Sequence, residues 1–302
     1  MAELARKITV VTVCDNHYAV LLAALLKSIE INYKGDSEID LYIVEDGLTK
    51  QNQDKIAGSV SNDVFYIHWL KINEIIPDKS TLPLDASSFP LNVYVRLFIP
   101  YFISPLLEKV IYLDVDMIME KDIQELWNID LLDKVIAGVV DRSGVVSSTW
   151  GGISNYKELG LSADTKYFNS GLLLFNPKKW RELNSTDRIL KCVNENKKYT
   201  NFPDQYGLNV VFADQWLELD SKWNCYAVSE ESDPYLIHFI GVKPIYSSYA
   251  YNEIYKTRFY HYLQYTQWAG FKPHNSYVRL IKKLYNKIVK KGHEFLSKKS
   301  NS

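Results

Sequence analysis

The sequence predicts an α/β fold built around a largely parallel sheet. Two observations point to it: short β-branched runs alternate along the chain with segments that favour helices, and a polar turn joins the first such pair. This alternation is typical of βαβ units, in which helices cover the faces of a parallel sheet. With 302 residues, of which 47% are hydrophobic, the chain is long enough for one large domain of this class.

The chain is predicted to open with a strand, a turn and a helix. Residues 8–13 (ITVVTV) form a β-branched run typical of a buried strand, and a polar turn follows at 14–17. Residues 18–33 are rich in Ala and Leu, which favours a helix. The alternation continues with a strand at 39–45, a helix at 49–60 and a strand at 64–69.

A loop separates these elements from the next group. Residues 77–92 contain three Pro and four Ser or Thr, a composition typical of a loop, and loops of this length are often functional. Beyond it we expect a helix at 92–102 and strands at 109–112, 135–140, 171–175 and 236–239. The third of these strands is stopped by Asn176 and Pro177, because proline cannot continue a strand ladder.

The overall charge is nearly balanced, with a formal net charge of −1, so no global field recruits nucleic acid. Three widely spaced cysteines, Cys14, Cys192 and Cys225, indicate a reducing compartment and neither a disulfide framework nor a zinc site. No signal peptide and no apolar run of about 20 residues is present, so we expect a cytoplasmic protein.

Residues 277–302 form a basic segment. They contain eight Lys or Arg and one Glu, a net charge of +7, so the rest of the chain carries −8. Apolar residues recur at three- and four-residue spacing over 277–296, which predicts a basic amphipathic helix. Such a helix suits a peripheral position on an anionic membrane face, where each basic side chain contributes about 1 kcal/mol. Packing of the helix back on its own domain is the alternative.

Two carboxylates stand in an otherwise apolar run, KVIYLDVDMIM at 109–119. A buried charge without a partner is costly, so Asp114 and Asp116 need a compensating group. Residues i and i+2 of an extended chain point to the same side, and this pair follows a strand, where open α/β sheets bind ligands. Carboxylate oxygens suit Mg²⁺ or Mn²⁺, whereas turn capping or pairing with lysines are the alternatives.

The Asp pair is one of six short segments that together resemble glycosyltransferase family 8. This family comprises retaining nucleotide-sugar transferases, including glycogenin and bacterial lipopolysaccharide galactosyl- and glucosyltransferases. The resemblance runs in order from about residue 8 to 244 and implies a GT-A type, Rossmann-like nucleotide-diphospho-sugar transferase fold with a mainly parallel central sheet. Its segments are DNHYA at 15–19, VYVRL at 93–97, KVIYLDVDMIM at 109–119, YFNSGLLLFNPKKW at 167–180, PDQYGLN at 203–209 and HFIGVKP at 238–244.

The resemblance implies a metal site with three ligands. Asp114 and Asp116 match the DxD of the family, and His238 matches its third ligand. An imidazole beside two carboxylates favours Mn²⁺ over Mg²⁺, because nitrogen ligands suit the softer ion. Mg²⁺ remains the second choice of cofactor, and an ordinary structural histidine is the alternative for His238.

The resemblance also implies how the donor nucleotide is held. Asp15 and Tyr18 match the positions that hydrogen-bond and stack on uracil. His17 stands where the family commonly has Asn. Arg96 matches an arginine that reaches the diphosphate or the donor sugar, with a surface salt bridge as the alternative. The remaining donor-binding positions are Val115, Gly241 and Lys243, the last of which matches a lysine that contacts the phosphates.

A third set of matching positions surrounds the donor sugar. Asn169 and Ser170 match the segment that closes on the sugar, and Asp141 and Asp204 match acidic residues that bind its hydroxyls. Gln205 matches the residue on the face of the anomeric carbon opposite the leaving group, so Gln205 and Asp204 are the candidate catalytic residues. A covalent route needs a carboxylate nucleophile there, and an amide is a poor one, which favours front-face attack.

The expected function is retaining transfer of a hexose from UDP-galactose or UDP-glucose to a hydroxyl of a glycan, glycolipid or glycoprotein acceptor in bacterial surface polysaccharide or glycoprotein synthesis. The alternatives are a non-catalytic nucleotide-sugar-binding protein and a self-glucosylating enzyme of the glycogenin kind. A sugar-nucleotide pyrophosphorylase is disfavoured, because residues 11–20 contain no glycine. We expect a catalytic domain at 1–250, a C-terminal extension at 251–276 and the basic helix at 277–302.

Overall fold

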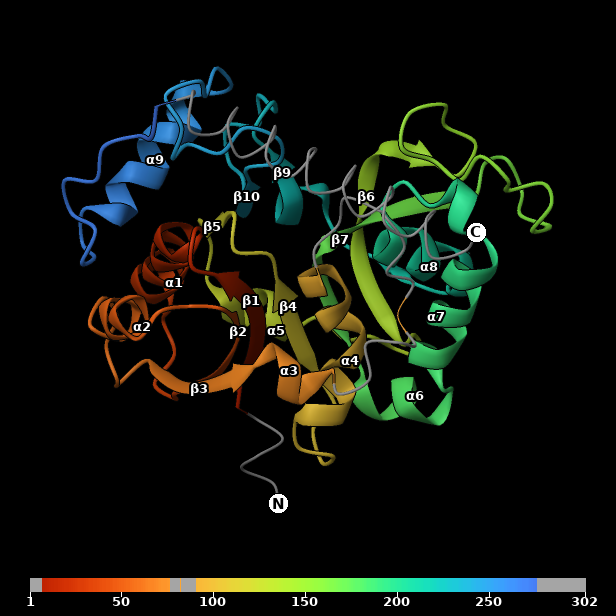
Figure 1. Ribbon diagram of the computed structural model, residues 1–302, viewed down its shortest axis with the longest axis horizontal. Helices are drawn as coiled ribbons and strands as arrows, with labels where there is room; N and C mark the ends of the chain where they lie inside the picture. The colour runs from red at the N-terminus through yellow and green to blue at the C-terminus, as the bar shows by residue number, and fades with distance from the viewer. Residues whose placement is uncertain (1–6, 77–81, 83–90, 276–302) are drawn as a thin grey trace, which may run out of the picture.

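The fold is described from a computed structural model, which covers residues 7–76, 82 and 91–275 (Figure 1). Its main sheet has the strand order β3-β2-β1-β4-β7-β6-β8. The strands are β1 (Thr9–Asp15), β2 (Ile39–Asp46), β3 (Phe65–Lys71), β4 (Val110–Leu113), β6 (Ile136–Val145), β7 (Lys166–Phe175) and β8 (Leu217–Glu218). The first four strands of the order pair in parallel, while β7 is antiparallel to both β4 and β6. The predicted α/β fold with a mostly parallel sheet is therefore confirmed.

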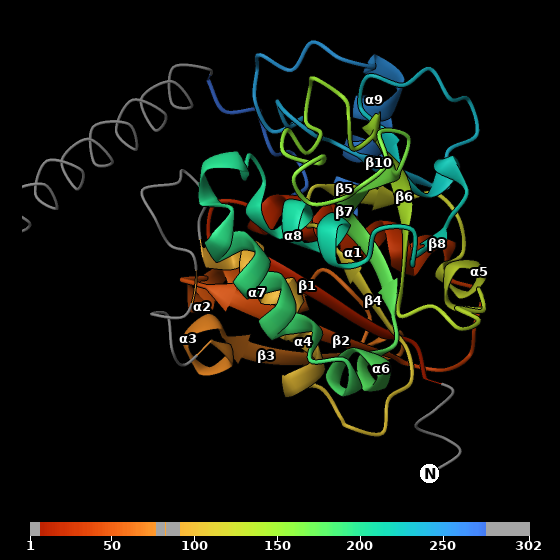
Figure 2. The ribbon, with the colours of Figure 1, turned by 90° about the vertical axis from the view of Figure 1, so that its right-hand side faces the viewer.

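Helices cover both faces of this sheet (Figures 1 and 2). Alternate strand residues point to opposite faces, so Val10 packs in one buried cluster and Val11 in the other. The first face carries α1 (Ala19–Asn32), α2 (Lys50–Ala57) and α5 (Ile123–Trp127). The opposite face carries α3 (Ile72–Ile75), α4 (Val95–Phe102), α6 (Pro177–Glu182), α7 (Ser185–Glu195) and α8 (Pro203–Val211).

A second, three-stranded sheet lies beyond the carboxyl end of β4. It has the order β5-β10-β9 and is made of β5 (Met117–Met119), β9 (Cys225–Tyr226) and β10 (Leu236–His238). Helix α1 packs against this sheet, because its Val20 and Leu21 belong to the same buried cluster as Ile118 of β5 and Ile237 of β10. The chain thus passes directly from the main sheet into the second one through residues 114–116, which places this segment between the two sheets.

All of the predicted strands occur, but two of them are longer than predicted. The strand expected at 135–140 continues as β6 to Val145, and the one expected at 171–175 begins as β7 at Lys166. The two pair as a long antiparallel hairpin whose register shifts twice, and this pairing continues through polar residues that a hydrophobic pattern cannot identify. Helices α3, α5, α6, α7 and α8 were not predicted.

The predicted C-terminal extension contains a helix, α9 (Glu253–Leu263). Its buried Phe259 and Leu263 share a cluster with Val20 and Ala24 of α1, so α9 covers that helix (Figure 1). The division at residue 250 stays a prediction. The predicted basic helix at 277–302 and most of the predicted loop at 77–92 lie outside the described residues. Within the part of the chain that the structure describes, no helix is both long and apolar enough to cross a membrane.

Candidate active site

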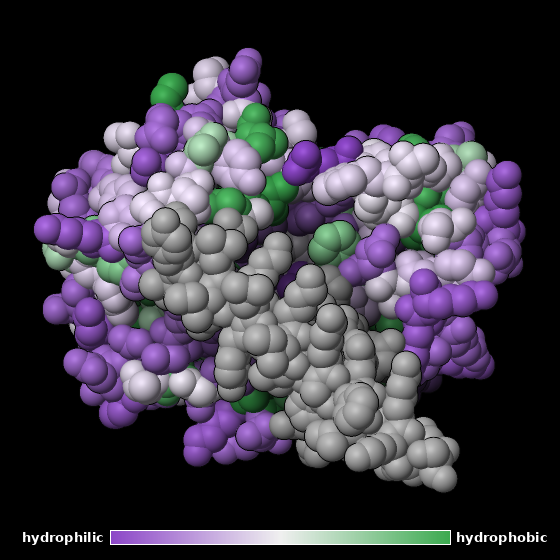
Figure 3. All heavy atoms as spheres, turned by 45° about the horizontal axis from the view of Figure 1, so that its top comes forward, coloured by the Kyte–Doolittle hydropathy of each residue, from purple (hydrophilic) through white to green (hydrophobic). Residues whose placement is uncertain are grey.

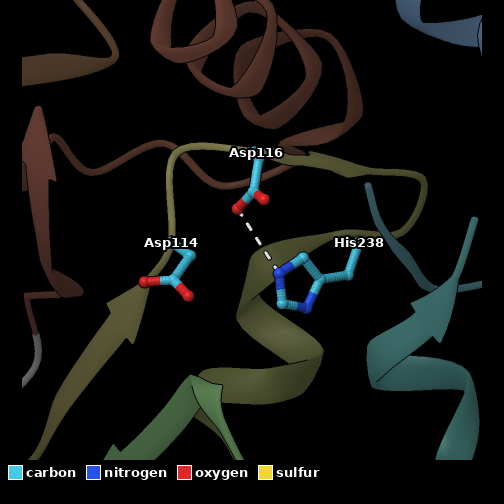
Figure 4. A group of neighbouring side chains, drawn as sticks. All are labelled: Asp114, Asp116 and His238. Carbon is cyan, nitrogen blue, oxygen red and sulfur yellow. Dashed lines mark ion pairs between the residues drawn. The ribbon is translucent and has the colours of Figure 1, made fainter. Parts of the chain in front are cut away.

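Asp114 and Asp116 follow the carboxyl end of β4, and their carboxylates lie close together, as predicted. Strand β4 ends at Leu113, and the backbone N–H of Asp114 still donates to the carbonyl of Gly171 on β7 (2.8 Å), but Val115 and Asp116 then form a turn rather than the extended chain that was predicted. Val115, between them, is buried and belongs to the cluster under the sheet. The two carboxylates lie near His238 of the second sheet (Figure 4).

His238 reaches this point from the second sheet. Strand β10 pairs antiparallel with β5, and the register places His238 opposite Met117, next to Asp116. The backbone N–H of Phe239 also donates to the carbonyl of Asp116 (2.8 Å). One ligand atom from each of Asp114, Asp116 and His238 lies within 4.8 Å of the others, and the three side chains point into one space (Figure 4).

The donor chemistry of these three side chains fits a divalent cation. His238 directs Nε2 toward Asp116, with 3.4 Å between Nε2 and Oδ1, because its Nδ1 lies 2.9 Å from Asn224 Oδ1. Two carboxylates and one imidazole nitrogen form a small, mixed oxygen and nitrogen set, which first-row divalent metals accept. Asp114, Asp116 and His238 therefore form a candidate divalent-metal site.

Gly171 is what allows His238 to lie so close to β7. A Cβ atom at this position would stand 2.6 Å from His238 Cε1 and 2.9 Å from Asp114 Oδ2. Separations this short are not tolerated between unbonded atoms, so any side chain at 171 would push the imidazole or the carboxylate out of place. A glycine in a strand often marks such a close approach.

The charge on Asp116 is balanced by Lys243 in this structure. Lys243 Nζ forms an ion pair with Asp116 Oδ2 and donates to the carbonyl of Phe239 (2.7 Å). Burial acts to raise the pKa of Asp116, but the charge of the neighbouring Lys243 acts in the opposite direction, and the pKa lies below its usual value. The pKa of Asp114 is instead raised, chiefly by burial, although Arg96 acts in the opposite direction. Asp116 therefore stays ionised to lower pH than Asp114.

Arg96 is buried and contacts several side chains of the site, so the predicted alternative of a surface salt bridge is wrong. Its side chain on α4 is 7% exposed. The Nη2 atom donates to Asp114 Oδ1 (3.0 Å), Nε lies 3.2 Å from Asp204 Oδ2, and Nη1 donates to Ser170 Oγ (2.9 Å). The planar guanidinium thus holds two carboxylates and strand β7 at fixed positions, which a lysine could not do.

The residues predicted around the donor sugar form one connected cluster. Gln205 Oε1 accepts from the Ser170 backbone N–H (3.0 Å) and from Asn169 Nδ2 (3.2 Å). Asn169 Nδ2 also donates to Asp141 Oδ2 (3.0 Å), and Ser170 Oγ donates to Asp204 Oδ2 (3.0 Å). Strands β6 and β7 and the first turn of α8 supply these five side chains, and the structure brings all of them beside the candidate metal site.

The predicted uracil-binding turn lies at the carboxyl end of β1. Asp15 Oδ1 accepts from the backbone N–H groups of His17 (2.8 Å) and Tyr18 (2.9 Å), which fixes the turn before α1. His17, which departs from the family pattern, is held by Tyr246, with 2.5 Å between Nε2 and the phenol oxygen. The His274 ring stacks on His17 at a centroid distance of 5.9 Å. The C-terminal segment thus fixes the residue at the unusual position.

In the space-filling view, the surface is hollowed between the region around α9 and the loops that follow β6, and hydrophilic residues lie in the hollow (Figure 3). The strand ends that carry the Asp pair and the sugar cluster face this side of the molecule (Figure 1).

A sequence model described as "Glycosyl transferase family 8" matches residues 9–245, which is most of the chain.

The chain belongs to glycosyltransferase family 8.

Similar proteins agree with this membership. General stress protein A of Bacillus subtilis is 25% identical over 280 residues, which span 86% of this chain and 94% of that protein. A lipopolysaccharide 1,2-glucosyltransferase of Escherichia coli is 25% identical over 242 residues, 78% of this chain and 69% of that protein. The present chain is accordingly a glycosyltransferase.

Solved structures show the same fold. The galactosyltransferase LgtC, determined in complex with donor and acceptor sugar analogs, superposes with a TM-score of 0.71 at 23% identity, over 88% of this chain and all of that one. The bifunctional glycosyltransferase WbbM superposes with a TM-score of 0.73 at 21% identity, over 87% of this chain and 50% of that one. The predicted GT-A fold is confirmed.

The structure gives each of the predicted site residues a definite place in the fold. They lie at the carboxyl ends of β1, β4 and β10, in the loop that follows β10, on the β6–β7 hairpin, or on the first turns of α4 and α8. Gly241 adopts a left-handed conformation (φ +74°), and a Cβ there would stand 2.9 Å from the Tyr251 phenol oxygen, so the position requires glycine.

Sequence reasoning missed several residues that contact the site. Asn224 binds His238, and Tyr246 and His274 hold His17. Asn224 follows a tryptophan in a short 3-10 turn, Ser221–Asn224, that has no recognisable motif. Nothing in the sequence around these residues could have identified them, because each contact joins segments that are far apart in the chain.

Proposed function

We propose that this glycosyltransferase transfers a hexose from UDP-glucose or UDP-galactose to a hydroxyl of a glycan or glycoconjugate acceptor, uses Mn²⁺, and retains the anomeric configuration. The observation that carries the proposal is the convergence of Asp114, Asp116 and His238 on one point next to the sugar cluster. The imidazole nitrogen favours Mn²⁺ over Mg²⁺. The names of the similar glucosyltransferase and galactosyltransferase support a hexose donor.

The charges around the metal site suit a nucleotide diphosphate. A bound divalent ion supplies positive charge that stabilises the UDP leaving group. We assign Lys243, which pairs with Asp116, to the phosphates. Arg96 forms ion pairs with Asp114 and Asp204 and so keeps both carboxylates in place. Asp15 and Tyr18 are assigned to the base, in a turn whose backbone is already fixed. Preorganised groups of this kind stabilise developing charge without having to rearrange.

The sugar cluster supports front-face attack rather than a covalent intermediate. Gln205 Oε1 already accepts from Ser170 and Asn169, and an amide oxygen is in any case a poor nucleophile. The Asp204 carboxylate is buried and bound to Arg96 and Ser170, which lowers its reactivity. In the front-face route the acceptor hydroxyl attacks the anomeric carbon on the side that UDP leaves, and a leaving phosphate oxygen takes the hydroxyl proton.

A donor screen tests this proposal. Wild-type protein is incubated with UDP-glucose, UDP-galactose or UDP-N-acetylhexosamines, and released UDP is measured with Mn²⁺ or with EDTA. We expect release from one of the two hexose donors in Mn²⁺ and loss of release in EDTA, with ADP- and GDP-sugars as inactive controls. Equal release with and without the metal would contradict the proposal.

The same experiment separates the alternatives. A non-catalytic binding protein would bind a UDP-sugar without releasing UDP from any donor, with or without a panel of glycan acceptors. A self-glucosylating enzyme would gain mass in multiples of one hexose after incubation with UDP-glucose, which intact-mass measurement detects.

Membrane contact through 277–302 is a proposal that rests on the basic amphipathic pattern alone.

A further inference from the structure

Three side-chain hydrogen bonds connect the candidate metal ligand His238 to Asp141 in the sugar cluster. His238 Nδ1 lies 2.9 Å from Asn224 Oδ1, Asn224 Nδ2 lies 3.0 Å from Asn169 Oδ1, and Asn169 Nδ2 lies 3.0 Å from Asp141 Oδ2. Asn224, the middle member, is 2% exposed, so no bulk water competes for its amide. We call these four residues the amide relay.

A backbone group fixes the direction of the whole relay. The N–H of Gly171 can only donate, and it lies 3.0 Å from one side-chain atom of Asn169. That atom must therefore be the amide oxygen, which leaves the Asn169 NH₂ group facing the Asp141 carboxylate, an acceptor. The atom that Asn224 presents to the Asn169 oxygen must then be its own NH₂ group. The orientation of both amides follows from donor and acceptor types alone.

The direction of the relay determines which nitrogen of the His238 imidazole carries the proton. Because Asn224 presents its NH₂ group to Asn169, it presents its oxygen to His238, and an oxygen requires a proton on Nδ1. A neutral imidazole with its proton on Nδ1 has its lone pair on Nε2. That atom faces Asp116 Oδ1 at 3.4 Å, on the side where the metal site lies.

We propose that Asn224 is a positioning residue, which holds His238 in the Nδ1–H tautomer and aims its Nε2 at the metal position. The inference rests on the proposed metal site and extends it, because Asn224 also ties the metal ligand to Asn169 and Asp141 on the sugar side. Groups that hold the second nitrogen of a metal-bound histidine typically change metal affinity by about 10- to 100-fold when removed.

The tautomer itself can be observed without any metal. In protein labelled with ¹⁵N-histidine, at mildly alkaline pH, two-bond nitrogen–proton spectra show which nitrogen carries the proton, and the His238→Gln spectrum identifies the His238 signals. We expect the Nδ1–H pattern in wild type and in Asn224→Asp, which keeps an acceptor for Nδ1. We expect it to be lost in Asn224→Leu, which has none. An Nε2–H pattern in wild type would overturn the inference.

Binding of Mn²⁺ alone, followed by the electron paramagnetic resonance of the free ion, provides the second readout. We expect an affinity about 10- to 100-fold weaker in Asn224→Leu and a smaller loss in Asn224→Asp. Asn155→Leu is the matched control: Asn155 is 3% exposed and also joins two side chains, Asn196 (2.9 Å) and Tyr206 (2.9 Å), but lies outside the relay. Its Mn²⁺ affinity should equal that of wild type.

Two outcomes would overturn the role of Asn224. One is wild-type Mn²⁺ affinity in Asn224→Leu, and the other is an equal loss in Asn224→Leu and Asn224→Asp, since a purely structural role would not depend on an acceptor at this position. Wild-type protein that binds no Mn²⁺ would instead contradict the proposed metal site, and the histidine spectrum would still decide whether Asn224 sets the tautomer.

Discussion

Asp116→Asn is expected to lower the Mn²⁺-dependent release of UDP by about 10³-fold or more. Asp116 is the one carboxylate of the site that contacts both His238 and Lys243, and its pKa is held below its usual value, so it is ionised whenever the metal binds. Asparagine keeps the size of the side chain but removes the charge. Metal-assisted stabilisation of a leaving group is worth several kcal/mol, and each 1.4 kcal/mol is a factor of about ten in rate. Initial rates of UDP release measure the effect.

Asp122→Asn is a matched control for this substitution. Asp122 is 8% exposed, like Asp116, but it accepts from the backbone N–H of Gln124 (2.9 Å) at the start of α5. Asparagine caps helices about as well as aspartate, so stability and activity should stay close to wild type. Substantial activity in Asp116→Asn, with circular dichroism showing both variants folded, would remove the metal assignment.

Gly171→Ala is expected to lower both Mn²⁺ affinity and UDP release by about 10²-fold. The new methyl group would stand 2.6 Å from His238 Cε1 and 2.9 Å from Asp114 Oδ2, so it would displace two ligands at once. A misplacement of about 1 Å at a reacting centre is enough for a loss of this size. The cost to folding should be about 1–3 kcal/mol, as for other overpacked cores. Metal titration, UDP-release assays and urea unfolding measure these effects.

Gly138→Ala is the control that tests whether an added methyl group elsewhere in this sheet would also lower Mn²⁺ affinity. Gly138 lies in the neighbouring strand β6, where a Cβ would stand 3.1 Å from the ring of Phe168. It should cost some stability but leave Mn²⁺ affinity unchanged, because Phe168 is not a ligand. A Gly171→Ala variant that binds Mn²⁺ as well as Gly138→Ala would show that the close approach of β7 does not shape the metal site.

The sequence predicted the parts of the site that depend on local spacing. The apolar run before Asp114 and Asp116 predicted that the pair follows a strand, although a turn at Val115 and Asp116, rather than an extended chain, brings the two carboxylates together. The order of the six segments predicted the family and hence the fold. Short runs of apolar residues predicted every strand of the main sheet except β8, which has two residues.

The rest depends on pairings between distant segments. His238 reaches the site only because β10 pairs antiparallel with β5 in a second sheet, and no periodicity of residues 236–238 predicts that partner. The burial of Arg96 arises from its contacts with Asp204 and Ser170, on two other elements. Asn224 joins His238 to Asn169 across gaps of 14 and 55 residues. Such contacts follow from tertiary packing rather than from local pattern.

The central claim is that Asp114, Asp116 and His238 hold a divalent ion that binds the diphosphate of UDP. Isothermal titration of UDP into the wild-type protein, with Mn²⁺ and again with EDTA, tests it most directly. We predict a Kd at least about tenfold lower in the presence of the metal, a difference of about 1.4 kcal/mol, and loss of that difference in Asp116→Asn. Binding of UDP with the same affinity in Mn²⁺ and in EDTA would contradict the claim.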